Sequence, residues 1–241
     1  MDFANILFGG PCNRACPFCI GKQLALPLRQ NNLRLYPLRN QQSFVEEVRR
    51  RGIRQIVFTG TTTDPQLYRY EERLLDELRR QLPDAEFSLH SNGALALRKM
   101  QVFNQYDRVC LSIPSLDADV YERAMGSRRV PDLGEILRRA QVPVKVSAVL
   151  YETEGLTAFL EQLHDLGVER LVLRRLLGDP RQLELPPKLE TNGNYRGNPV
   201  FRWGRMEVTY WDFEVTQSTS LNLFPDGTLS PHYRLTAQAA R

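Results

Sequence analysis

Short apolar runs alternate with amphipathic segments along the first three quarters of the chain. The apolar runs are rich in β-branched residues and cover residues 5–8, 55–58, 86–90, 108–113, 144–150 and 170–174. The segments between them have helical periodicity and cover 43–51, 66–82, 95–104, 117–125 with 132–140, and 156–166. Six strand–helix units in series predict an α/β fold whose parallel sheet has right-handed crossovers, either doubly wound or a complete or partial barrel.

Local signals set the bounds of the first predicted helix. Ser43 and Glu46 have the spacing of a capping box, and Gly52 follows the last helical residue, Arg51. The sequence therefore predicts a helix from Ser43 to Arg51.

The pattern changes after residue 177, which divides the chain into predicted segments 1–177 and 178–241. Residues 178–199 are rich in Pro, Gly and Asn and predict a long loop, of the kind that often forms a lid or binding loop. Residues 205–215 and 218–233 are strand-like, with a hairpin signal at Asp226-Gly227. We expect this extension to close the barrel and shape a substrate pocket, with Trp203, Tyr210 and Trp211 as candidate stacking surfaces.

Polar and glycine residues cluster just past the carboxyl ends of the predicted strands. They are Cys12, residues 59–65, residues 91–93, Ser112 with Ser115, residues 151–155, and Arg174 with Arg175. Parallel sheets and barrels place their active sites at this edge. The sequence therefore predicts one site built from the loops of all six units.

Composition narrows the class of protein. The 241 residues carry a net charge of +4, and no apolar run approaches the roughly 20 residues that a membrane span needs. The N-terminus lacks the basic residues of a secretory signal, so we expect a soluble cytoplasmic protein. Arginines crowd residues 29–54, which indicates either a nucleic-acid or acidic-substrate surface or a solvated helix face with a loop.

Three of the four cysteines lie in one stretch, "FGGPCNRACPFCIGKQL", at Cys12, Cys16 and Cys19. Disulfides are a poor explanation, because the only other cysteine, Cys110, lies in a predicted buried strand. A zinc site needs a fourth ligand, and the three histidines, His90, His164 and His232, are distant in sequence. An iron–sulfur cubane held by three thiolates fits better, and one of its irons would lack a protein ligand.

The order Cys-x3-Cys-x2-Cys, with Phe18 before the last cysteine, resembles the cluster loop of the radical S-adenosylmethionine (SAM) enzymes. The strand–helix units from about residue 5 to 177 resemble the partial (β/α)6 barrel of that family, with a C-terminal β-hairpin extension. The resemblance implies that Cys12, Cys16 and Cys19 hold a [4Fe–4S] cluster and that the amino and carboxylate groups of SAM chelate its fourth iron. It also implies that Phe18 lies beside the adenine.

The resemblance implies further SAM contacts at the strand ends. The family's Gly-Gly-Glu-Pro loop binds the SAM amino group; here Thr59, Gly60, Thr61 and Thr62 stand in its place, without the acid, so backbone carbonyls or a threonine hydroxyl would accept from that group. Asn92 and Ser112 are candidates for ribose and carboxylate contacts, and Ser147 is a further candidate. Arg174 is a candidate for the SAM carboxylate or an acidic substrate, with an exposed salt bridge as the alternative. His90 either donates a hydrogen bond to a residue that itself contacts the ligand, or is a structural histidine.

One cluster is expected, because His232 stands where family members with an extra cluster carry a cysteine. The resemblance implies reductive cleavage of SAM to a 5′-deoxyadenosyl radical, which abstracts hydrogen from a peptide or small-metabolite substrate. An external one-electron reductant such as flavodoxin or ferredoxin would be required. Two alternatives remain: a tRNA-modifying radical SAM enzyme, and a binding module that holds zinc or an electron-transfer cluster without SAM.

Overall fold

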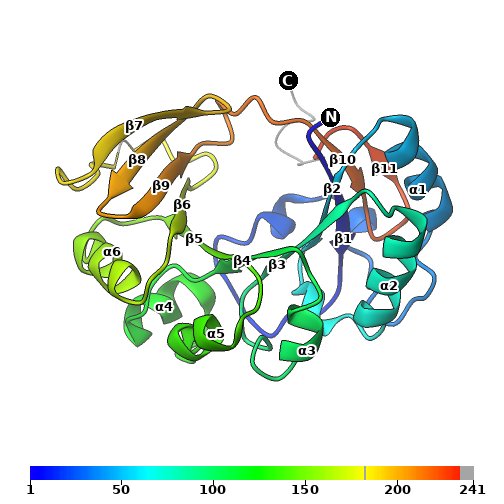
Figure 1. Cartoon of the computed structure of the whole chain (residues 1–241), viewed down its shortest axis with the longest axis horizontal. Coiled ribbons are helices and arrows are strands. Elements are labelled where there is room, and N and C mark those ends of the chain that lie inside the picture. Colours follow the sequence, from blue (N-terminus) through cyan, green and yellow to red (C-terminus); the bar gives the residue numbers. More distant parts are fainter. Residues whose placement is uncertain (182, 234–241) are drawn as a thin grey trace.

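The computed structural model describes residues 1–181 and 183–233, whose strands form a single curved sheet (Figure 1). Eleven strands in these ranges have the order β11-β10-β1-β2-β3-β4-β5-β6-β9-β8-β7. The six strands predicted for the barrel are β1 (Phe3–Phe8), β2 (Gln55–Gly60), β3 (Glu86–Ser91), β4 (Arg108–Ser112), β5 (Val144–Leu150) and β6 (Arg170–Arg175). They pair in chain order, each parallel to the next, which confirms the predicted α/β architecture.

The helices lie along the outside of the curved sheet (Figure 1). They are α1 (Gln41–Arg50), α2 (Glu71–Gln81), α3 (Met100–Phe103), α4 (Ala118–Met125), α5 (Leu133–Arg139) and α6 (Leu156–Asp165), with short 3-10 helices η1 (Ile20–Gln23), η2 (Leu26–Arg29) and η3 (Pro65–Leu67). A buried apolar layer between sheet and helices forms the core; it includes Phe58, Leu74, Phe87 and Phe103. Because these helices cover the outer face, the inner face of the sheet is available to bind a ligand.

The predicted start of the first helix is wrong. Helix α1 begins at Gln41, after Asn40 in the left-handed region at φ 55°, so Ser43 is already helical and makes no capping box with Glu46. The buried Gln41 accepts a hydrogen bond from the backbone N–H of Leu38 through its side chain, which anchors the earlier start. The helix ends at Arg50, one residue before the predicted end, and Gly52 follows the Arg51 cap at φ 62°, as the glycine signal indicated.

Two other predicted helices are shorter than their periodicity indicated. Residues 66–82 divide into η3 and α2, because Asp64 caps a short turn through the backbone N–H of Gln66 and the chain is extended at the buried Tyr68. Residues 95–104 yield only the four helical residues of α3, after a series of turns.

The segment after β6 contains strands where a loop was predicted. Strands β7 (Glu190–Tyr195) and β8 (Asn198–Trp203) form a hairpin, so the predicted loop is confirmed over the described residues of 178–189 and wrong from Glu190 on. Arg196 and Gly197 connect them at φ 53° and 85°, as a two-residue type I′ turn requires. Strand β9 (Met206–Trp211) then pairs parallel to β6 and antiparallel to β8.

The last strands extend the opposite edge of the sheet. Strand β10 (Ser220–Leu223) pairs parallel to β1, and β11 (Leu229–Ser230) pairs antiparallel to β10. The predicted Asp226-Gly227 hairpin is confirmed, since the Asp226 carboxylate accepts from the backbone N–H of Thr228 at 2.9 Å. Residues 212–219 cross the open side of the sheet from β9 to β10 (Figure 1). Residue 182 and residues 234–241 of the predicted 178–241 segment lie outside the described residues.

No helix in residues 1–181 or 183–233 combines the length and apolar character that a membrane crossing requires.

Candidate functional site

The cysteine loop leaves the carboxyl end of β1 and is held at its base by a buried side chain. Asn32 accepts a hydrogen bond from the backbone N–H of Gly9 at 3.0 Å, and its own backbone N–H donates to the Gly9 carbonyl at 3.1 Å. No side chain fits at Gly9, where an added Cβ would lie 2.3 Å from the carbonyl oxygen of Gln30. Gly10 has a φ of 139°, which only glycine adopts readily.

The three predicted cluster ligands each lie against a different neighbouring segment. The Cys12 Sγ is 4.0 Å from the Nδ2 of Asn92, after β3. The Cys16 Sγ is 3.6 Å from the Sδ of Met125, at the end of α4. The Cys19 Sγ is 3.6 Å from the carbonyl oxygen of Thr61, after β2. The thiols therefore line a space enclosed by loops from several units.

The electrostatics of these thiols favour a cationic partner. Burial raises the pKa of the Cys16 thiol, and repulsion from Cys19 and Cys12 raises it further, to about 11. Burial also raises the pKa of Cys12. Three thiolates at this site would repel one another, and bound metal offsets such repulsion by deprotonating its thiol ligands outright.

A single metal ion and an iron–sulfur cluster make different demands on the ligands. Across residues 1–181 and 183–233, no three His, Cys, Asp or Glu side chains are grouped as the ligands of one metal ion. Zinc requires four ligands around one centre. In a [4Fe–4S] cluster the thiolates are distributed over several irons. Among the described residues, then, no set of four side chains is grouped as a zinc site.

The threonines after β2 hold the cysteine loop in place. Thr61 and Thr63 donate through their hydroxyls to the carbonyls of Phe8 and Pro11, at 2.9 and 2.6 Å. The Thr62 hydroxyl lies 3.2 Å from both the backbone nitrogen and the carbonyl oxygen of Gly10. All four residues predicted to meet the SAM amino group, 59–62, line the cavity. The Thr61 hydroxyl is engaged by the end of β1 and the Thr62 hydroxyl by the cysteine loop.

The loop after β3 is fixed by Asp64, whose part in the site the sequence did not reveal. The Asp64 carboxylate is buried and accepts from the backbone N–H of Asn92 at 2.6 Å and from the Ser91 hydroxyl at 3.0 Å. Asn92 in turn donates through Nδ2 to the Asn13 Oδ1 at 2.8 Å, within the cysteine loop. The predicted site residue Asn92 therefore lies beside Cys12, as the sheet order leads one to expect. An Asp-Pro pair at a strand end was the only signal for Asp64.

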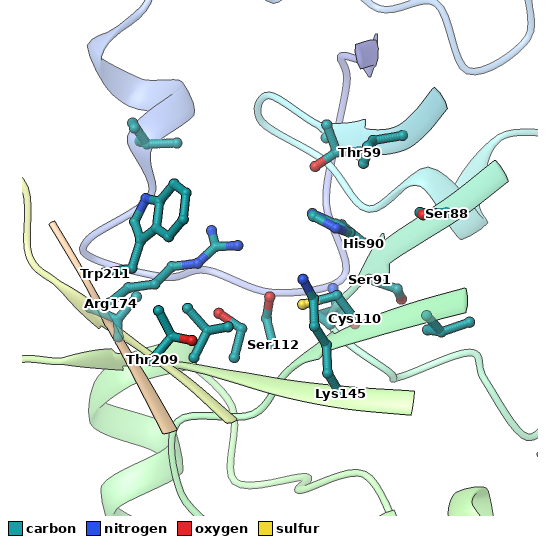
Figure 2. Close-up of a pocket in the computed structure, with 18 of the residues that line it drawn as sticks. Thr59, Ser88, His90, Ser91, Cys110, Ser112, Lys145, Arg174, Thr209 and Trp211 are labelled. Atoms are coloured by element: carbon teal, nitrogen blue, oxygen red, sulfur yellow. The ribbon is translucent and has the colours of Figure 1, made fainter. Parts of the chain in front are cut away.

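The remaining predicted residues lie around the same space. Phe18 is 36% exposed, and its ring centroid is 5.1 Å from that of Tyr151. Ser112 and Ser147 are paired in register on β4 and β5, and both line the cavity. Arg174 points into the cavity from the end of β6 (Figure 2), and no ion pair involves it among the described residues, so the salt-bridge alternative is wrong.

A cavity of about 1530 Å³ occupies the inner side of the sheet and includes the cysteine loop. Its wall also carries residues to which the sequence assigned no ligand, notably Lys145 on β5 and the buried Cys110 on β4 (Figure 2). Alternation along parallel strands brings such side chains to one face, but their lengths and directions are not readable from periodicity. Of the candidate stacking surfaces, Trp211 lines the cavity, whereas Trp203 is buried against the cation of Lys188.

No residue of the arginine-rich region, 29–54, lines the described cavity. Arg50 and Arg51 both bind the carboxylate of Glu47 on α1, at 2.8 and 2.7 Å. Arg49 donates to the carbonyl of Gln81. These contacts favour the solvated helix face over a nucleic-acid surface.

Comparison with known proteins gives one sequence family. The model of the Radical SAM superfamily matches residues 6–166. No curated protein sequence matches the chain.

Several solved structures have a similar fold. SuiB of Streptococcus suis bound to its precursor peptide SuiA has a TM-score of 0.58 and 14% identity, over 73% of this chain and 40% of that chain. Native anSMEcpe with bound AdoMet has a TM-score of 0.53 and 17% identity, over 80% and 55% of the two chains. Methylornithine synthase (PylB) has a TM-score of 0.51 and 13% identity, over 73% and 54%. The chain thus spans between 40% and 55% of the length of these proteins.

Proposed function

The chain belongs to the radical SAM superfamily, and from that membership we propose that it initiates radical chemistry on a peptide or small-metabolite substrate. As a member it is an enzyme that uses a [4Fe–4S] cluster and SAM. When bound, these cofactors supply a 5′-deoxyadenosyl radical that abstracts hydrogen from the substrate. The observation that carries the proposal is the placement of Cys12, Cys16 and Cys19 around one space at the carboxyl edge of the sheet.

We assign the cluster ligands to these three cysteines. The contacts of the cysteine loop with Thr61, Asn92 and Met125 support the assignment, because they hold the loop curled at the mouth of the cavity. The number of thiols supports an iron without a protein ligand, since Cys110 is buried on β4, outside the loop.

The SAM contacts are proposals of the same kind. Phe18 would lie beside the adenine. The adenine would then replace part of the contact that the Phe18 ring makes with Tyr151. Thr59, Gly60, Thr61 and Thr62 would meet the amino group through backbone carbonyls, because the hydroxyls of Thr61 and Thr62 already bind the carbonyls of Phe8 and Gly10. Asn92, Ser112 and Ser147 would meet the ribose and carboxylate.

The C-terminal extension would shape the substrate pocket. Trp211 on β9 and Ser220 on β10 both line the cavity, from opposite edges of the sheet. Residues 212–219 cross the open side between them (Figure 1). These positions support a pocket that is enclosed by the extension, with the cysteine loop at one end.

The substrate class is proposed from the cavity and from the structural relatives. One relative is bound to a precursor peptide, and another is a synthase named for a small amino acid, so both peptide and small-metabolite substrates occur on this fold. Glu47 partly neutralises the arginine-rich region, so we place tRNA second. We also propose an external one-electron reductant such as flavodoxin or ferredoxin.

The direct experiment is to reconstitute the full chain with iron and sulfide without oxygen, reduce it, and incubate it with SAM. We expect about four irons per chain and formation of 5′-deoxyadenosine. Cys16→Ala should abolish that product and lower the iron content, whereas Cys110→Ala, at the cysteine outside the loop, should keep the wild-type iron content. Full iron binding without any 5′-deoxyadenosine, with dithionite or with a flavodoxin, would contradict the proposal.

A further inference from the structure

Three basic side chains face the cavity from three different strands. His90 on β3 and Lys145 on β5 both pair in register with Cys110 of β4, so they flank it on either side. Arg174 on β6 pairs with Val149, which lies on the same face of β5 as Lys145. Figure 2 shows Lys145 extending toward His90 and Cys110, and Arg174 extending into the cavity from the other side, with Ser112 between them.

These basic groups have no acidic partner. Within residues 1–181 and 183–233, no hydrogen bond or ion pair links the side chains of His90, Lys145 or Arg174 to a carboxylate, and the Arg174 Nε is buried without a hydrogen-bond partner. The adjacent Arg175 is the contrast, because it binds the Asp212 carboxylate at 2.7 Å. Lys145 and Arg174 are half-buried, and a half-buried cation is stabilised by an anion beside it, so these unpartnered groups point to an anionic ligand.

The acids that line the cavity are engaged elsewhere or form no ion pair with these basic groups. Asp64 accepts from Asn92 and Ser91. Glu207 pairs with Arg170 at 3.2 Å, and Asp107 pairs with Arg79 at 2.9 Å. Glu169 immediately precedes β6, at the end of that strand opposite to Arg174 and, by register, near Lys145; no ion pair joins Glu169 to Lys145 among the described residues. Within the described part of the chain, then, no carboxylate of the wall forms an ion pair with these basic groups.

The electrostatics agree with this geometry. Burial lowers the pKa of Lys145, and the nearby Arg174 lowers it further. Burial lowers the pKa of His90 well below its usual value, with Lys145 and Arg174 contributing. A bound oxyanion would reverse these effects by attracting the charged forms.

We propose that His90, Lys145 and Arg174 bind a carboxylate or phosphate group of the substrate, an assignment that rests on the function proposed above. The guanidinium of Arg174 presents a planar fork suited to two oxygens of such a group, and the Lys145 ammonium provides a compact third donor. Trp211 is paired in register with Arg174 and gives the site an aromatic wall. The substrate is therefore an acid-bearing metabolite or a peptide that presents an acidic residue or its C-terminal carboxylate.

The test uses the rate at which acetic anhydride modifies each lysine of the reconstituted full chain, measured by mass spectrometry. The probes are inorganic phosphate and succinate, with chloride to equalise ionic strength. We expect either anion to slow acetylation of Lys145 at least fivefold, with less than a twofold change at Lys188, which is exposed near Trp203. The more protective anion identifies the oxyanion. Arg174→Gln should remove most of the protection.

A second measurement, made first on the wild-type chain, tests the proposal even if one of the variants folds poorly. The thermal midpoint of the wild-type chain should rise with phosphate or succinate concentration, because ligands that bind the folded state stabilise it. Lys145→Met and Arg174→Gln should each raise at least tenfold the anion concentration that is needed for a given rise in the thermal midpoint. The circular dichroism spectrum establishes that each variant is folded. No protection by either anion, or equal protection of Lys188, would overturn the proposal.

SAM also carries a carboxylate and is the competing occupant. If SAM, added without phosphate or succinate, protected Lys145, and if phosphate competed with SAM for binding, the assignment to substrate would be overturned. If SAM and phosphate bound independently, it would be supported. Neither result depends on SAM cleavage, so failure of this site remains distinguishable from failure to form 5′-deoxyadenosine.

Discussion

The carboxylate of Asp64 accepts a hydrogen bond from the backbone N–H of Asn92 at 2.6 Å, so that the loop after β2 positions the loop after β3. Asn92 then reaches the cysteine loop through Asn13. One buried acid thus connects three of the loops that surround the proposed cluster site.

Replacing Asp64 with Ala should loosen this connection. The backbone N–H groups of Asn92 and Gln66 would both lose their acceptor, at a cost of about 2–4 kcal/mol in the free energy of unfolding. We expect SAM affinity, measured by calorimetry on the reconstituted protein, to fall about tenfold because a group that orients the site is lost. Asp84→Ala, at an exposed position after α2, is the control and should change neither quantity. Unchanged SAM affinity in a folded Asp64→Ala protein would contradict this role.

The same carboxylate should give the folding stability a pH dependence. Burial raises the pKa of Asp64 above 3.8, against the opposing effect of its hydrogen bonds from Asn92, Gln66 and Ser91. The folded state therefore binds a proton over a pH range in which the unfolded state has released it, and this contribution to stability is lost as pH rises from 3.8 through the folded pKa. In urea unfolding of the cluster-free chain, the free energy of unfolding should decline less over that pH window for Asp64→Asn than for the wild type. An identical decline in both proteins would remove Asp64 as its source.

The sequence predicted those parts of the fold and of the candidate site that depend on hydrophobic periodicity and on the order of strands in the sheet. The six parallel strands and the grouping of Cys12, Asn92 and Ser112 at one edge all follow from strand–helix alternation. The hairpin at Asp226-Gly227 was predicted from its turn residues.

The failures have local physical causes. Strands β7 and β8 were missed because β7 is fully exposed and carries Asn, Gly and Thr in place of an apolar alternation; its pairing depends on the neighbouring strand and the Arg196-Gly197 turn. The start of α1 was misplaced because the long-range bond from Asn40 to the Gly227 carbonyl and the buried Gln41 override the Ser43 signal. Lys145 was overlooked because a lysine in a strand is usually exposed, and only the sheet's curvature places it in a cavity.

Gly21 should not tolerate a side chain. An added Cβ would lie 1.8 Å from the backbone carbonyl oxygen of Thr61, the same carbonyl that contacts the Cys19 Sγ. Gly21→Ala should therefore separate the cysteine loop from the β2 loop, destabilising the fold by about 1–3 kcal/mol and lowering iron retention in an iron assay.

Gly134→Ala is the matched control. This glycine lies within helix α5, and an added Cβ would meet nothing closer than 3.5 Å. Alanine there should stabilise the fold by about 0.5–1 kcal/mol without affecting iron retention. Equal iron content in the two variants would show that the contact between Gly21 and Thr61 is not needed by the site.

Phe18→Ala should weaken SAM binding. Phe18 is exposed on the cysteine loop beside Tyr151, and stacking of a base on an aromatic ring contributes about 1–3 kcal/mol. We expect the dissociation constant of SAM, measured by calorimetry, to rise about tenfold on this basis, with full retention of iron. Leu26→Ala, a more exposed apolar residue nearby in the chain, should leave both unchanged. Wild-type SAM affinity in Phe18→Ala would exclude the adenine contact.

The central claim is that three cysteines hold the cluster and leave one iron for SAM. Electron–nuclear double resonance on the reduced, reconstituted full chain, with SAM labelled with ¹⁵N at its amino group, tests it directly. The account predicts a ¹⁵N hyperfine coupling to the cluster, absent with unlabelled SAM. A cluster that shows no such coupling under SAM saturation, and instead a fourth ligand from the protein, would contradict it.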